Sequence, residues 1–136
     1  MIIVDAGVLI AAADVDDDYH EACSRLFNER GSEFIVPATV VVEVCWMLAG
    51  HVSVILEADF LDSISEGELR VEVLDRTDYA RASELVTTYA DFPLGMVDAS
   101  VVAIAERLNI SEIATLDHRH FNVVRPRHVE AFTLIP

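Results

Sequence analysis

The chain has 136 residues, enough for one domain with a substantial core, and its hydrophobic content of 53% is typical of folded proteins rather than disordered ones. It carries 24 acidic residues against nine basic ones, all of them Arg, for a net charge of −15. The lack of Lys excludes mechanisms that need a catalytic or phosphate-binding Lys. A surface this acidic repels nucleic acid over most of its area and suits a basic partner, so any nucleic-acid contact has to be local.

Two cysteines, Cys23 and Cys45, fall in apolar helical stretches and lack the spacing of a zinc site. We expect them to be small buried residues in a reducing compartment. No signal peptide is recognisable, and the longest apolar stretch, residues 34–48, contains Pro37 and Glu43 and is too short to span a bilayer. The sequence therefore predicts a single soluble domain, residues 1–136, in the cytoplasm and not in a membrane.

Strand and helix patterns alternate along the whole chain. The first apolar run, residues 1–4, ends at Asp5 and is typical of a strand buried on both faces of a parallel sheet. Further strands are predicted over residues 33–36, 69–74, 113–116 and, at an edge, 132–135. Helices are predicted over residues 6–13, 18–30, 38–49, 52–65 and 77–89, with a last one beginning at Asp98. This alternation predicts an α/β fold with a central parallel sheet of four to five short strands flanked by helices.

Two of these helices have unusual apolar patterns. Helix 38–49 is apolar nearly all round apart from Glu43, and Gly50 is expected to end it. We predict that this helix is buried, where an unpaired Glu is costly. Helix 52–65 has apolar residues on two sides, so that one side can face the core and the other a second subunit.

Four carboxylates interrupt the apolar segments. Asp5 and Asp117 each follow an apolar strand. Asp98 stands at a helix N-terminus, and Glu43 lies about one and a half turns into its helix. Ligands of an open α/β sheet bind outside the carboxyl ends of the strands, where we expect these side chains to meet. Taken singly, Asp98 and Asp117 can cap helices and Asp5 can bind loop amides, so these alternatives stay open.

Clustered carboxylates repel one another and raise one another's pKa, and a hard divalent cation relieves the repulsion. Oxygen ligands without His or Cys favour Mg²⁺ or Mn²⁺ over zinc or copper. Such ions lower the pKa of a bound water and stabilise charge that develops on a phosphodiester. We therefore predict a catalytic Mg²⁺ or Mn²⁺ site for phosphodiester hydrolysis, with Thr115 and Ser100 as supporting or substrate-contacting groups.

Three segments carry this pattern: MIIVDAGVLIAAAD, PATVVVEVCWML and LGMVDASVVAIAERLNISEIATLDHRHF. In this order and at these separations they resemble the PIN domain, and more narrowly the VapC-type ribonuclease toxins of bacterial toxin–antitoxin systems. The resemblance covers essentially the whole chain.

The resemblance implies a PIN-like three-layer fold and a metal-dependent endoribonuclease that acts as the toxin of a toxin–antitoxin pair. The acidic ligands of the family fall on Asp5, Glu43, Asp98 and Asp117. The family's frequent Ser or Thr before the last of them falls on Thr115. Members typically form homodimers and are held inactive by a cognate antitoxin, often one that places a basic side chain near the acidic site.

The only concentration of basic residues is segment 118–128, HRHFNVVRPRH, directly after Asp117. Arg binds phosphate through two hydrogen bonds, and His gains charge as the pH falls. We predict that Arg119 and its neighbours contact the RNA substrate; the alternative is a solvated loop with no role. Asp91 and Ser100 lie beside the acidic motif, and whether either contacts metal is left open.

Other classes that gather carboxylates at strand ends fit less well. A receiver domain usually relies on a Lys, which is absent, and a haloacid-dehalogenase-like phosphatase needs a second Asp where Gly7 stands. A dinucleotide-binding fold needs a glycine-rich turn after the first strand, and only Gly7 is present there. The remaining alternative is a PIN-like module that binds RNA or protein without catalysis.

Overall fold

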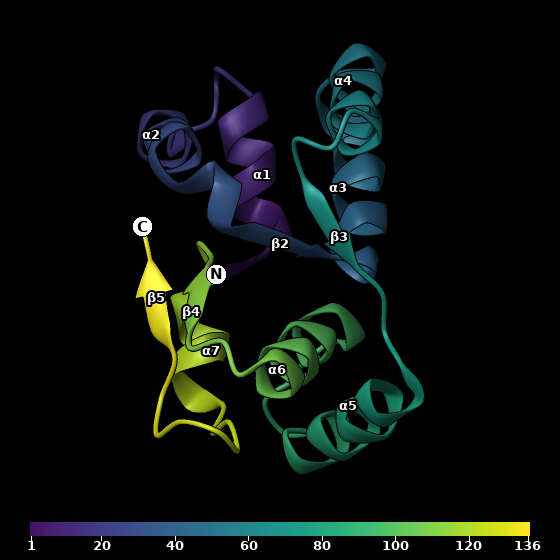
Figure 1. Ribbon diagram of the computed structural model, residues 1–136, viewed down its shortest axis with the longest axis vertical. Helices are drawn as coiled ribbons and strands as arrows, with labels where there is room; N and C mark the ends of the chain where they lie inside the picture. Colours follow the sequence, from purple (N-terminus) through teal and green to yellow (C-terminus); the bar gives the residue numbers. More distant parts are fainter.

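The computed structural model describes all 136 residues and contains a five-stranded sheet in which every neighbouring pair of strands is parallel (Figure 1). The strands are β1 (Ile2–Val4), β2 (Phe34–Pro37), β3 (Arg70–Glu72), β4 (Glu112–Ala114) and β5 (Thr133–Ile135). Their order across the sheet is β3-β2-β1-β4-β5. The predicted α/β class, the parallel sheet and the edge position of the last strand are confirmed.

Helices cover the sheet on both sides, as a parallel sheet with apolar faces requires. They are α1 (Ala6–Ala13), α2 (His20–Arg30), α3 (Ala38–His51), α4 (Val54–Ser65), α5 (Arg76–Thr88), α6 (Met96–Leu108) and α7 (His118–Val123), with a short 3-10 helix η1 (Gly31–Glu33). In Figure 1, β2 runs between two groups of helices, α1 to α4 above it and α5 to α7 below. None of these helices has the length and apolar character needed to cross a membrane.

Strand β1 is the centre of the core. All three of its residues are fully buried, with β2 and β4 as hydrogen-bonded neighbours and α6 packed against it. Seven consecutive residues of α6, Ala99–Ala105, are buried as well. Asp5 and Asp98 directly adjoin these two buried segments, so the core rather than a loop determines where they lie.

Helix α3 differs from the prediction in burial and in length. Only the stripe Val40, Val44 and Leu48 is buried, whereas Val42 and Trp46 are each 69% exposed. The prediction of a fully buried helix was therefore wrong, because nothing in this chain covers the outer face. The helix also runs through Gly50 to His51, since a helical Gly costs only about 1 kcal/mol and does not by itself end a helix.

Other boundaries differ by one or two residues because caps decide where helices begin. Helix α4 begins at Val54 rather than residue 52, since the Ser53 hydroxyl accepts a hydrogen bond from the Ile55 amide. Helix α6 begins at Met96 after the N-cap Gly95, not at Asp98. Strand β4 ends at Ala114 rather than residue 116, and the chain turns there into α7.

Ion pairs anchor α6 to α5. Arg107 binds the buried carboxylate of Asp78 at 3.0 Å, and Arg81 binds Glu106 at 2.9 Å. The hydrogen bond to Asp78 is the largest of the effects that raise the pKa of Arg107. Because α6 also carries Asp98 in its first turn, these pairs help to hold that carboxylate in place.

Candidate metal centre

The four predicted carboxylates come from four different elements. Asp5 follows β1, Asp117 is the N-cap of α7 beyond β4, Asp98 lies in the first turn of α6, and Glu43 lies within α3. β1 and β4 are neighbouring parallel strands, so Asp5 and the residues after β4 leave the sheet at one edge. Burial, followed by the charges of Asp5, Asp117 and Glu43, raises the pKa of Asp98 to about 7. The other three carboxylates therefore lie within electrostatic reach of Asp98.

Asp5 is almost completely buried and is linked to β4 by Thr115. One of its carboxylate oxygens accepts a hydrogen bond from the Ala6 amide at 2.8 Å, and the other accepts one from the Thr115 hydroxyl at 3.0 Å. Thr115 is itself fully buried, and its hydroxyl also accepts a hydrogen bond from the Asp117 amide at 2.9 Å. Burial raises the pKa of Asp5, while these two hydrogen bonds oppose the rise. One Thr hydroxyl thus connects the two aspartates at the strand ends.

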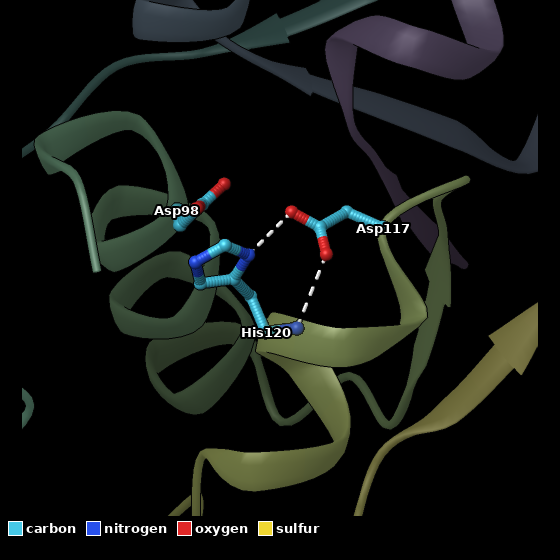
Figure 2. Close-up of side chains that lie close together, drawn as sticks. All are labelled: Asp98, Asp117 and His120. Carbon is cyan, nitrogen blue, oxygen red and sulfur yellow. Dashed lines mark hydrogen bonds and ion pairs between the residues drawn. The ribbon is translucent and has the colours of Figure 1, made fainter. Parts of the chain in front are cut away.

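Asp117 both caps α7 and binds a histidine. Its Oδ1 accepts a hydrogen bond from the His120 amide at 3.1 Å, and its Oδ2 lies 2.6 Å from His120 Nδ1 (Figure 2). The capping alternative is therefore true for Asp117, whereas Asp98 makes no capping bond and the N-cap of its helix is Gly95. Capping uses only part of the hydrogen-bonding capacity of the carboxylate, so it does not exclude a second role.

Asp98, Asp117 and His120 form a possible cation site. One ligand atom from each residue lies within 4.8 Å of the others. Figure 2 shows Asp98 projecting from α6 toward the pair on α7. The sequence analysis did not single out His120, which it treated as part of a basic segment. The sequence feature that could have identified His120 is its position three residues after Asp117 at the start of a helix. This spacing places both side chains on the same side of the first turn.

Glu43 approaches the group from α3. Burial and the charge of Asp5 raise its pKa, so this carboxylate also faces the acidic cluster. The side chain is half-buried rather than enclosed. It lies between the buried stripe of α3 and the exposed face that carries Val42 and Trp46.

Ser100 and Asp91, whose roles were left open, occupy different surroundings. Ser100 is fully buried, and its hydroxyl donates to the Val97 carbonyl at 2.6 Å. Since a hydroxyl has one proton, Thr39 must donate in the 2.5 Å bond between Thr39 and Ser100, which links α3 to α6. Asp91 is exposed in the turn between α5 and α6 and is not part of the cation group.

The basic segment 118–128 begins as helix α7 rather than as a loop. Arg127 pairs with Glu84, and Arg125 donates to the Asn122 carbonyl. Arg119 is exposed next to His120, and its guanidinium carbon lies 4.9 Å from the centroid of the Phe92 ring. Of these three arginines, Arg119 is the nearest in sequence to Asp117 and His120. It forms no ion pair with the acidic cluster.

The donor set fits a hard divalent cation. The side chains that converge are carboxylates with one imidazole. Burial is the main cause of the raised pKa of Asp98, and the charges of the neighbouring carboxylates add a repulsion that a cation would relieve. Cys23 lies on α2 and Cys45 on α3, and neither belongs to the cation group, so the thiolate set of a structural zinc site is absent from this position.

The fold and this cluster define a class of α/β protein with a carboxylate-rich cation site at the carboxyl edge of a parallel sheet. Residues 2–125 match the PIN domain family, and the chain belongs to that family. Ribonuclease VapC26 of Mycobacterium tuberculosis is 31% identical over 135 residues, which are 99% of this chain and 100% of that protein.

Two solved structures share the fold at low sequence identity. VapC20 of Mycobacterium tuberculosis, a toxin that cleaves the sarcin–ricin loop, has a TM-score of 0.77 at 18% identity and covers 83% of this chain and 87% of its own. A toxin–antitoxin complex from Klebsiella pneumoniae has a TM-score of 0.71 at 14% identity, covering 91% and 92%. The predicted PIN-like fold is confirmed.

The raised pKa of Asp98 predicts that the metal-free protein loses stability as the pH rises. Asp98 titrates near 7 in the folded chain against an ordinary value of 3.8, so the folded state holds an extra proton between about pH 4 and pH 7. We expect Asp98→Asn to remove part of this loss and to raise the free energy of unfolding at pH 8 by about 1 to 3 kcal/mol. Urea unfolding in EDTA at pH 5 and pH 8 measures the effect.

Asp62→Asn, at an exposed position of α4, is the matched control and should keep the wild-type pH dependence. The same pH dependence in the wild type and in Asp98→Asn would contradict the electrostatic interpretation of Asp98.

Proposed function

We propose that this chain is a metal-dependent endoribonuclease that acts as the toxin of a toxin–antitoxin pair. The observation that carries the proposal is that carboxylates from separate elements, those of Asp5, Glu43 and Asp117, lie close enough to Asp98 to raise its pKa in a PIN-domain chain. Such an arrangement is costly for folding alone, because like charges repel and partly buried ones lose hydration. The similarity to a named ribonuclease over 99% of the chain supports the same activity.

The cation is Mg²⁺ or Mn²⁺, as the oxygen-rich donor set favours. The residues that would hold it, and that form the catalytic set, are Asp5, Glu43, Asp98 and Asp117. When bound, such an ion lowers the pKa of a water and stabilises the charge that develops on the phosphodiester. His120 orients Asp117 through Nδ1 and is a further candidate ligand.

Two buried hydroxyl groups support this set without adding charge. Thr115 joins Asp5 to the backbone of Asp117, so it keeps the two aspartates at a constant separation. Ser100 joins α6 to Thr39 on α3, the helices that carry Asp98 and Glu43. We assign both a supporting role rather than contact with RNA, because both are fully buried.

Cleavage should depend on metal and on Asp5. Purified protein is expected to cut a mixture of tRNA, rRNA and mRNA with Mg²⁺ or Mn²⁺ and to stop when EDTA is added. Asp5→Asn keeps the size of the side chain but removes the charge that a cation needs. We expect it to lower the cleavage rate about 100-fold or more, since metal ions contribute several kcal/mol to such reactions. Gel analysis of the RNA products measures both effects.

Asp62→Asn, exposed on α4, serves as the control and should cut like the wild type. A wild type that neither cuts RNA nor gains thermal stability with Mn²⁺ would contradict the proposal. That result would favour a non-catalytic module that binds RNA or protein.

Arg119 is the proposed contact to the RNA backbone. A chain of charge −15 repels RNA over most of its surface, so a single exposed Arg beside the site has a large influence. We expect Arg119→Ala to raise KM about 3- to 10-fold with little change in kcat. It should also reduce the salt dependence of log KM by about 0.7, the value of one lost phosphate contact on a single strand. Steady-state cleavage at several salt concentrations measures both.

Arg25→Ala is the control, because Arg25 is exposed on α2 and already paired with Glu21. Wild-type KM and salt dependence in Arg119→Ala would exclude Arg119 from substrate binding.

A cognate antitoxin is the proposed protein partner. A toxin–antitoxin complex shares the fold at a TM-score of 0.71, and a chain of net charge −15 suits a basic partner segment. Co-purification with the product of an adjacent small open reading frame tests this, and cleavage that this product leaves uninhibited would contradict it.

A second copy of the chain is the proposed partner of the apolar surface on α3 and α4. This surface consists of Val42, Trp46, Val54, Ile55 and Leu61, whose exposure ranges from 44% to 73%. Exposed apolar patches of this kind mark protein interfaces more often than free surface. We expect Trp46→Glu to convert a dimer into a folded monomer, because the charge would be buried in the interface. Light scattering after size exclusion measures the mass.

Val73→Glu is the control, since Val73 is 68% exposed but lies outside this surface. A monomeric wild type at micromolar concentration would contradict the proposed dimer.

A further inference from the structure

Phe92 contacts two consecutive side chains of α7, although it comes from the turn between α5 and α6. The guanidinium carbon of Arg119 lies 4.9 Å from the centroid of the Phe92 ring. The centroid of the His120 ring lies 4.8 Å from the same point, with 48° between the ring planes. His120 in turn binds Asp117 through Nδ1 at 2.6 Å. One half-buried aromatic ring therefore lies against both the acidic cluster and the Arg beside it.

Arg119 is one of three Arg residues, with Arg76 and Arg125, that form no ion pair with a carboxylate. Six of the nine Arg form ion pairs with Asp or Glu, as expected where 24 acidic residues are available. Arg119 stacks on Phe92 instead. Stacking occupies the face of a guanidinium and leaves its N–H groups, which lie in the plane, free for an anion. Arg119 thus keeps its hydrogen-bond donors available beside the acidic cluster.

The position of Phe92 does not depend on Arg119. The Phe92 amide donates to the Tyr89 carbonyl at 3.0 Å, which closes the turn. The Tyr89 hydroxyl accepts a hydrogen bond at 2.9 Å from the Arg125 amide, just beyond the C-terminus of α7. Leu94, two residues after Phe92, is buried in the core. The turn is therefore fixed at several points, and the flexible Arg119 side chain takes its direction from the ring.

We propose that Phe92 is a positioning residue that holds Arg119 for contact with an RNA phosphate, a role that rests on the proposed ribonuclease function. Without the ring, the guanidinium would sample many rotamers, and the surrounding carboxylates would compete for it. The contact with His120 keeps the ring at the border of the acidic cluster. A purely structural role would need only apolar volume at position 92, which Leu supplies, whereas the proposed role needs an aromatic face.

The test is a double-mutant cycle with steady-state cleavage of a fluorescent RNA. Phe92→Leu should raise KM about two- to fivefold with kcat nearly unchanged, the size of an exposed cation–π contact. Phe92→Tyr keeps the aromatic face and should stay close to the wild-type KM. Phe92→Leu combined with Arg119→Ala should raise KM no more than Arg119→Ala alone, because the first residue acts through the second. The thermal midpoint of each variant shows that the fold is intact.

Tyr79→Leu is the control, since it removes an exposed aromatic ring that contacts no cation. Binding of the same RNA in EDTA, followed by fluorescence anisotropy, gives a readout without cleavage, and Kd should change by the same factor as KM. A wild-type KM in Phe92→Leu, or effects of Phe92→Leu and Arg119→Ala that multiply, would overturn this inference alone. A wild type that neither binds nor cuts RNA would overturn the proposed function, and this inference with it.

Discussion

The structure depends on one constraint: the packed core holds several carboxylates close together, although their negative charges repel one another. The elements that carry Asp5 and Asp98 adjoin the most buried parts of the molecule, β1 and the middle of α6. They cannot move apart without opening the core, so the carboxylates cannot relax by separating. The charge has to be balanced locally, by a proton on Asp98, whose pKa is raised to about 7, or by a cation.

The few cationic side chains of this chain have distinct tasks. Most Arg residues form ion pairs, and those of Arg81 and Arg107 hold α5 and α6 together. The charge of His120 lowers the pKa of Asp98, so it partly offsets the repulsion inside the cluster. Arg119, stacked on an aromatic ring, keeps its donors free at the border of the site. In a chain of net charge −15, an Arg with free donors beside the acidic cluster is a local exception to a surface that repels anions.

Helix α3 connects the proposed active site to the proposed interface. Its buried stripe packs on the core, Glu43 faces Asp5, and Trp46 lies on the exposed side. Residues three positions apart on a helix are neighbours on one face, so Glu43 and Trp46 lie next to each other where the acidic cluster meets the exposed apolar surface. A second copy bound over Trp46 would lie close to the proposed catalytic carboxylates of the first, so dimer formation and RNA access would be linked through the orientation of this helix.

The sequence by itself determined the alternation of strands and helices, the parallel sheet and the positions of Asp5 and Asp117 beyond apolar strands, because these follow from local periodicity and from where apolar runs end. It predicted boundaries less well where a cap such as Ser53 set the start of a helix. The exposed face of α3, the role of His120 beside Asp117 and the stacking of Arg119 on Phe92 became visible only in the tertiary structure. These features depend on which distant elements pack together and on where their side chains point, and no local pattern encodes that.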